Sequence, residues 1–136
     1  MTITRIRNPK DLHTHTRNGK PVYSHVVITN RPNLVFISGQ LSKDENGGIV
    51  GKGDIRAQIR QVGRNLVLAL DAAGATLGDV VKSNTYVTDY ELYAKNADLR
   101  DAILGVTLPT STTVEVRRLS HPDCMIEIDV IAALPA

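Results

Sequence analysis

A single carboxylate interrupts an apolar stretch near the end of the chain, where Glu127 lies between Ile126 and Ile128. Burial of such a group raises its pKa and suits it to general acid or base work. An ion pair with Arg117 or Arg118, on the neighbouring predicted strand, would explain the carboxylate equally well. Both interpretations stay open at this point.

Two further polar positions could bind a small ligand. Ser38-Gly39-Gln40 ends an apolar run, and a glycine at a strand end lets a ligand or another backbone approach closely. A simple turn glycine would look the same. Asn96, on a predicted helix, could hold a carbonyl or a water, although an asparagine on the helix surface is the commoner case.

Metal and thiol chemistry have weaker signals. His13 and His15 would lie on one side of an extended segment, with His25 ten residues on, and alternate imidazoles can share a metal. No carboxylate accompanies them at a set spacing, so we predict a surface segment and no metal. Cys124 has only His121 nearby as a base, and we predict that it is a small buried hydrophobic residue.

Hydrophobic periodicity predicts the elements that position these groups. Runs rich in β-branched residues predict strands at 22–29, 34–38, 80–88, 112–118 and 125–133. Apolar stripes of helical spacing predict helices at 54–73 and 90–103, the first between an N-cap Asp54 and Gly74, the second with Leu92, Leu99 and Ile103 inward. The order β-β-α-β-α-β-β predicts an α+β fold with one mixed sheet under two helices. The two strands at each end of the chain should pair as antiparallel neighbours, with parallel pairing across the helices.

The last predicted strand has two different faces. Alternation places Ile126, Ile128, Val130, Ala132 and Leu134 on the face under the helices, and Met125, Glu127, Asp129 and Ile131 on the other. The second face is neither clearly polar nor clearly apolar. A subunit interface would fit this mixture, and plain solvent exposure is the alternative.

Composition limits the class of protein. The chain has 136 residues with a net charge of +2, 42% hydrophobic residues and 4% aromatic ones. This favours a single soluble domain over residues 1–136, with no nucleic-acid or membrane partner. One cysteine and no apolar leader segment favour a cytoplasmic location.

Taken in order, the chain resembles the reactive intermediate deaminase superfamily (Rid, YjgF-type, RidA-like) over residues 20–134. The matching residues are Tyr23-Ser24-His25, Ser38-Gly39-Gln40, Asp54, Gln58, Asn65, Ala72-Ala73-Gly74-Ala75, Asp79-Val80-Val81-Lys82, Tyr86-Val87-Thr88-Asp89, Asn96, Pro109, Val114-Glu115-Val116 and Glu127-Ile128.

The resemblance implies a chorismate-mutase-like α+β fold and a homotrimer with a ligand cleft at each subunit interface. It also implies hydrolysis of small imines or enamines to a carbonyl product and ammonia, with no cofactor. Glu127 matches the family glutamate that positions water, and Gly39, beside Ser38, matches its backbone amide site. Tyr23 and Asn96 match positions that line the cleft.

One position departs from the family pattern. The resemblance implies an arginine two residues after Pro109, which binds the substrate carboxylate, but Ser111 stands there. Arg117 lies about 20 Å further along the strand, too far to replace it. Losing a charge-assisted bond costs roughly ten- to a hundredfold in binding. We therefore expect the hydroxyls of Ser111 and Thr112 to favour a neutral carbonyl, an amide or a differently placed acid.

Two functions follow from this sequence. The first is a hydrolase that deaminates a small nitrogen metabolite, with Glu127 activating water. The second is a trimeric module that binds a small metabolite without turning it over, which the loss of the arginine favours. Ribonuclease activity, claimed for some relatives, gains little support from the small basic surplus.

Overall fold

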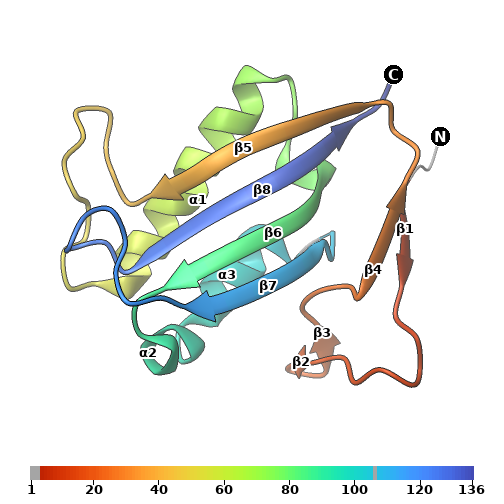
Figure 1. Ribbon diagram of the computed structural model, residues 1–136, viewed down its shortest axis with the longest axis horizontal. Coiled ribbons are helices and arrows are strands. Elements are labelled where there is room, and N and C mark those ends of the chain that lie inside the picture. Colours follow the sequence, from red (N-terminus) through yellow and green to blue (C-terminus); the bar gives the residue numbers. More distant parts are fainter. Residues whose placement is uncertain (1–3, 106) are drawn as a thin grey trace.

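The computed structural model describes residues 4–105 and 107–136, and its centre is a four-stranded sheet in the order β5-β8-β6-β7 (Figure 1). Strand β8 runs antiparallel to both of its neighbours, and β6 and β7 run parallel. Two-stranded sheets β1-β4 and β2-β3 lie outside it. The strands are β1 (Thr4–Arg7), β2 (Thr16–Arg17), β3 (Lys20–Pro21), β4 (Val26–Thr29), β5 (Asn33–Leu41), β6 (Val80–Val87), β7 (Thr110–Glu115) and β8 (Ile126–Leu134).

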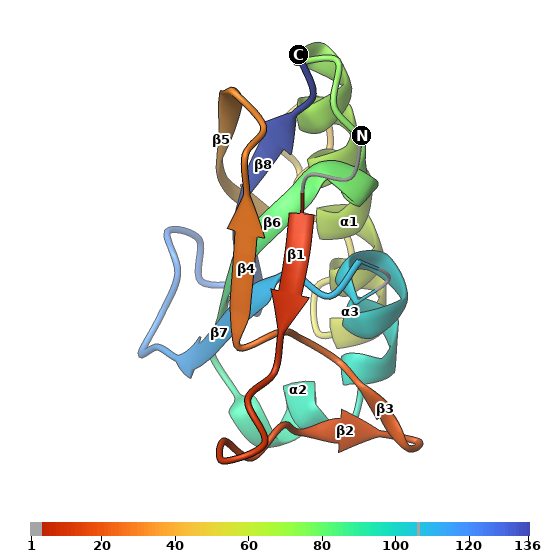
Figure 2. The ribbon, with the colours of Figure 1, turned by 90° about the vertical axis from the view of Figure 1, so that its right-hand side faces the viewer.

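The helices cover one face of this sheet, as the turned view shows (Figure 2). They are α1 (Ile55–Ala72), the 3-10 helix η1 (Leu77–Asp79), α2 (Tyr90–Ala94) and α3 (Ala97–Leu104). The core lies between α1 and the predicted inner face of β8, where Leu66 and Ile126 are fully buried. None of the helices in the described ranges is long and apolar enough to cross a membrane. The α+β class, the mixed sheet and the two-faced last strand are confirmed.

The long first helix also forms as predicted. Asp54 caps its beginning, because the Asp54 side chain accepts a hydrogen bond from the Ala57 N–H at 3.0 Å. Gly74 follows its end with φ of 73°, a left-handed conformation that costs glycine little.

The predicted pairing of the terminal strands is wrong. Strand β4 pairs with β1 instead of β5, and β8 lies between β5 and β6 instead of beside β7. The connection from β4 to β5 is held by Arg31, which ion-pairs with Asp79 and donates to the Ala133 carbonyl at 2.9 Å. It therefore crosses the end of the sheet instead of closing a tight hairpin. Towards the end of the chain, the parallel connection from β6 to β7 places β7 at the edge of the sheet. Strand β8 therefore pairs on the other side of β6, between β6 and β5.

The predicted helix over 90–103 is two helices. The helix is interrupted before Asn96, and the Asn96 side-chain amide donates to the Leu92 carbonyl at 2.8 Å. Leu92, Leu99 and Ile103 are partly buried and pack against the core, as predicted, and the fully buried residues form a neighbouring stripe. The buried residues are Tyr93, Ala97, Arg100 and Leu104. An arginine thus occupies an inward position of α3.

Candidate functional site

A cavity of about 340 Å³ lies where α2 and α3 meet the edge strand β7 and the segment that precedes β4. It is lined by His15, Arg17, Val22, Tyr23, Tyr90, Tyr93, Ala94, Ala97, Arg100, Asp101, Ser111 and Thr113. Tyr23 and Ser111, which are far apart in the sequence and were predicted to share one cleft, meet here. The volume leaves room for a small organic molecule.

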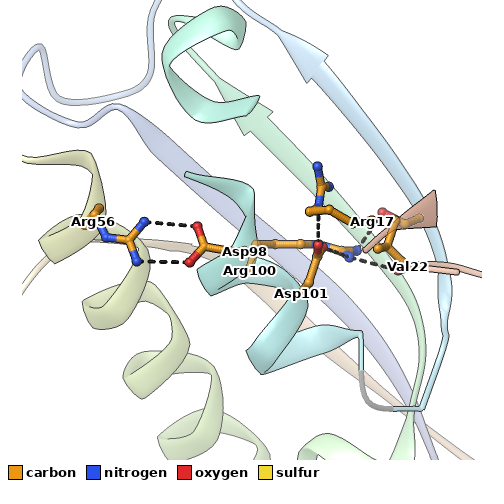
Figure 3. A network of polar contacts seen from close by, with 7 residues as sticks. Arg17, Val22, Arg56, Asp98, Arg100 and Asp101 are labelled. Carbon is orange, nitrogen blue, oxygen red and sulfur yellow. Dashed lines mark hydrogen bonds and ion pairs between the residues drawn. The ribbon is translucent and has the colours of Figure 1, made fainter. Parts of the chain in front are cut away.

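Arg100 is the most buried charged group of this cavity, with 3% of its surface exposed. Its Nη2 donates to Ser111 Oγ at 2.7 Å and to Ser83 Oγ at 3.0 Å. Its Nη1 donates to the Val22 carbonyl at 3.2 Å (Figure 3). Among the residues that the structure describes, Arg100 Nε has no hydrogen-bond partner. The guanidinium is therefore held mainly by neutral oxygens.

One carboxylate, Asp101, faces this guanidinium, and it is shared. Arg17 on β2 forms an ion pair with Asp101 Oδ2, and Arg100 Nη1 lies 3.4 Å from Asp101 Oδ1 (Figure 3). On the other side of α3, Arg56 contacts Asp98 through two bonds of 3.0 Å. This pairing holds the pKa of the Asp98 carboxyl below its usual value. The negative charge of Asp98 is therefore paired with Arg56 and does not offset the positive charge of the cavity.

The Tyr23 side of the cavity is fixed by its neighbour Ser24, which is buried. The Ser24 N–H donates to the Pro109 carbonyl at 3.1 Å, and its hydroxyl donates to the Leu108 carbonyl. Tyr23 lies in the irregular segment before β4, because the predicted strand at 22–29 begins only at residue 26. Its ring meets that of His25 edge-on, with centroids 5.2 Å apart.

The cavity also contains a buried phenol, that of Tyr93. Burial raises the pKa of Tyr93, and the nearby Arg100 cation opposes this rise. The phenol is therefore protonated at neutral pH and can donate a hydrogen bond. Tyr90, whose ring centroid lies 6.2 Å from that of Tyr93, lines the cavity beside it.

Glu127 lies on the opposite, uncovered face of the sheet. Strand β5 has an irregularity between Ile37 and Gln40, so that Ser38 and Gly39 leave the regular ladder. A Cβ at Gly39 would lie 1.9 Å from Glu127 Oε2, so only glycine leaves room for this carboxylate. This agrees with the close approach expected at Gly39. Ser38 is exposed.

The ion-pair interpretation of Glu127 finds no support within the described ranges, where no salt bridge reaches this carboxylate. Arg118 instead donates to the Leu119 carbonyl at 3.0 Å. The neighbouring carboxylate Asp129 is occupied, because it accepts from Asn84 at 3.0 Å and from the Tyr86 hydroxyl at 2.8 Å.

The residues predicted to form one site thus fall into two groups. Tyr23 and Ser111 line the cavity on the helix side, whereas Gly39 and Glu127 lie on the outer face. Thr112 follows Ser111 on β7 and is exposed, so the two side chains point to opposite faces. Within one chain, the two hydroxyls cannot contact the same small ligand.

Of the remaining candidates, Asn96 and Cys124 lie outside the cavity, whereas His15 lines it. Asn96 Oδ1 accepts from Arg56 Nη1 at 3.2 Å, and its amide nitrogen binds the helix, so both ends of the side chain are occupied. Cys124 is buried, which raises the pKa of its thiol, and His121 Nδ1 accepts from the Asp123 N–H instead. His13, His15 and the rest of the described chain form no group of three or more His, Cys, Asp or Glu that could hold a metal ion.

Arg100 was missed by the sequence analysis, which sought a replacement for the absent arginine only along the same strand. The signal was the spacing of Tyr93, Ala97, Arg100 and Leu104, which follows one helical face as well as the predicted inward set of Leu92, Leu99 and Ile103 does. A charged residue in such a stripe is rarely buried without a partner.

Comparisons with known proteins agree with this architecture. A family model described as Endoribonuclease L-PSP matches residues 17–134. A solved structure from Yersinia pestis, titled a protein of unknown function of the conserved Rid family YyfB, superposes with a TM-score of 0.82. It shares 31% identity, and the match covers 98% of this chain and 100% of that one.

Two curated relatives carry functional names. The 3-aminoacrylate deaminase RutC of Acinetobacter baylyi is 31% identical, over 91% of this chain and 98% of its own length. A 2-iminobutanoate/2-iminopropanoate deaminase of Salmonella typhimurium is 36% identical, over 73% of this chain and 78% of its own.

Proposed function

Because the chain belongs to the Endoribonuclease L-PSP family, the Rid/YjgF proteins, we propose that it is a deaminase of small imines or enamines. An enamine first tautomerises to its imine by taking up a proton on carbon and losing one from nitrogen. Water then adds to the C=N carbon of the imine, and the resulting carbinolamine collapses to a carbonyl product and ammonia. The names of the two deaminase relatives support this reaction class. No cofactor is needed for this addition and elimination, because the C=N bond is itself electrophilic.

The observation that carries the proposal is the Glu127 carboxylate above Gly39. It lies on an open sheet face, close to the strand irregularity, and no described cation neutralises it. In the proposed mechanism Glu127 accepts a proton from the attacking water and returns it to the leaving nitrogen. The Gly39 N–H, beside Ser38, orients the substrate.

We further propose that three copies assemble so that the outer face of one lies against the β7 edge of the next. The outer face supports this, because Phe36 is 70% exposed and Leu34 is 53% exposed. Such packing would bring Glu127 of one copy toward the cavity of its neighbour and unite the two groups of residues. Asn96, just before α3, would shape the cleft indirectly by holding the end of α2, and Thr112 would lie within the interface. A reducing cytoplasm suits the single buried cysteine.

The test is a coupled assay in which a pyridoxal-dependent serine or threonine dehydratase generates the imine in situ. We expect the protein to accelerate ammonia release above the spontaneous rate. Glu127→Gln should abolish most of the acceleration, and Glu45→Gln, in an exposed loop, should leave it unchanged. No acceleration with any of several parent amino acids would rule out this activity.

A non-catalytic binding module is the second candidate, and Ser111 at the position of the family arginine favours it. Thermal-shift measurements with imine-derived keto acids would separate the two functions. A ligand that raises the melting temperature and is recovered unchanged, with no ammonia released from its imine, supports binding alone.

A further inference from the structure

Burial of the Arg100 guanidinium needs an explanation in electrostatic terms. A buried cation is costly unless an anion or a full set of hydrogen bonds compensates it. Arg100 is 3% exposed, yet its closest partners are the hydroxyls of Ser83 and Ser111 and the Val22 carbonyl. Its Nε has no partner in the described part of the chain. The compensation inside the protein is therefore incomplete.

The charges that line the cavity show the same imbalance. Two guanidinium groups, those of Arg17 and Arg100, share the single carboxylate of Asp101. Arg17 forms the shorter contact with it, whereas the Arg100 contact is 3.4 Å long and weak. The cavity wall thus carries one more positive than negative group.

We propose that Arg100 is the anion-binding residue of this cavity and that its ligand is the carboxylate of a small organic acid. Of the three ligands expected from Ser111, namely a neutral carbonyl, an amide or a differently placed acid, this proposal selects the acid. The arginine reaches the Ser111 hydroxyl from helix α3 instead of occupying position 111 on the strand. This inference rests on the proposed function for the reaction, but not for the binding.

Ser111 gains a defined part in this arrangement. Its oxygen accepts a hydrogen bond from Arg100 Nη2 at 2.7 Å, and a hydroxyl has one hydrogen of its own to donate. Among the described residues that hydrogen has no acceptor. A carboxylate can therefore accept from Ser111 while it replaces the long Asp101 contact at Arg100 Nη1. Such charge-assisted bonds are stronger than those to a neutral amide.

The single excess charge fits a monocarboxylate, and the cavity volume of about 340 Å³ leaves room for one. We would test this with propanoate and its uncharged isostere propanamide, titrated into the full-length protein and followed by NMR. The Nε–H of a buried arginine exchanges slowly enough to give a resonance of its own. We expect propanoate to bind at least ~10-fold more tightly than propanamide and to shift the Arg100 Nε–H resonance. Equal affinities, or binding without that shift, would overturn the proposal.

Variants provide a second measurement. Arg100→Met should weaken propanoate binding by about 10- to 100-fold and leave the weak propanamide binding unchanged. Arg56→Met is the matched control, because it removes a guanidinium bound to the same helix from a position outside the cavity. It should bind propanoate as the native protein does. If Arg100→Met does not fold, the milder Ser111→Ala variant replaces it. We expect Ser111→Ala to lose propanoate affinity several-fold, and an unchanged affinity would contradict the proposal.

A third titration identifies the kind of anion. Inorganic phosphate should compete with propanoate only at much higher concentration, because the site has a single excess charge. Competition at equal concentration would show a general anion site and would overturn the choice of a carboxylate.

The two proposals fail separately. Acid binding through Arg100 without ammonia release would refute only the deaminase function. Conversely, the native protein could release ammonia while the Arg100→Met variant still binds propanoate more tightly than propanamide. That result would refute only the role of Arg100.

Discussion

Gly39→Ala should separate the chemistry of the protein from its stability. The Cβ of the new alanine would lie 1.9 Å from Glu127 Oε2, 2.7 Å from its Cδ and 3.0 Å from its Cγ. Ordinary contacts of this kind are about 3.4 Å, so the carboxylate must move by roughly 1.5 Å. The atoms in conflict lie at the far end of a flexible side chain, so the backbone can stay in place.

The expected consequences differ in size. A rotation of Glu127 away from its preferred rotamer costs on the order of 1 kcal/mol in folding free energy. A displacement of about 1 Å in a reacting group can cost ~100-fold in rate. We therefore expect Gly39→Ala to fold, to melt within a few degrees of the native protein, and to lose about 100-fold in the rate of ammonia release in the coupled dehydratase assay.

Gly48→Ala is the matched control, because its Cβ would lie 2.9 Å from Asp44 Oδ2 and would not meet Glu127. It should keep the native rate. A double-mutant cycle then tests whether Gly39 acts through Glu127: once Glu127→Ala has removed the carboxylate, Gly39→Ala should have no further effect on rate. A full additional loss in the double variant, or a native rate for Gly39→Ala alone, would refute the reasoning.

Three further predictions concern the assembly, the core and the outer face. Phe36→Glu should convert the proposed trimer to monomers in sedimentation velocity, whereas Leu68→Glu, 65% exposed on α1, should not; equal behaviour of the two would contradict the assigned interface. The Gln58 side-chain amide is fully buried and forms hydrogen bonds with three backbone groups. Gln58→Ala should therefore lower the free energy of unfolding, measured by urea denaturation, by about 2–4 kcal/mol. A loss below about 1 kcal/mol would be inconsistent with that role. The hydrogen bond to Asp129 raises the pKa of Tyr86 above its ordinary value of 10.0, so Asp129→Asn should lower it in an ultraviolet titration of tyrosinate. Because the raised pKa belongs to the folded state, the stabilisation from this bond is present below the ordinary pKa and is lost as pH rises through the raised one.

The sequence predicted most reliably those features that depend on local patterns. Alternation along 126–134 identified the two faces of β8, and the spacing from Asp54 to Gly74 identified the first helix with both of its ends. These patterns are decided by burial and by capping, which act over a few residues. Strand pairing depends on contacts between residues that are distant in the sequence. For this reason local patterns could not predict the path of the β4–β5 connection, which the Arg31–Asp79 ion pair holds.

The candidate site was predicted in part for a related reason. Residue types identified Glu127 and Gly39, whose close approach the structure contains. The sequence did not indicate the break before Asn96, although Leu92, Leu99 and Ile103 pack against the core as expected. Helical spacing places Arg100 on one face with Tyr93 and Leu104, but its contacts with Ser83 and Ser111 depend on tertiary packing that the spacing alone does not reveal.

The cavity wall is closed by contacts between parts of the chain that are far apart in sequence. Arg100 and Val22 are separated by 78 positions, and both the Arg17–Asp101 and the Ser24–Leu108 pairs by 84. Contacts of such long range form only after a large loop has closed, so we expect them late in folding, once the sheet and α1 exist. They are also few and lie at the edge of the core. The segment from Arg17 to Ser24 should therefore detach and return while the sheet stays folded, so that amide hydrogen exchange there is governed by local opening and is slowed by a bound acid.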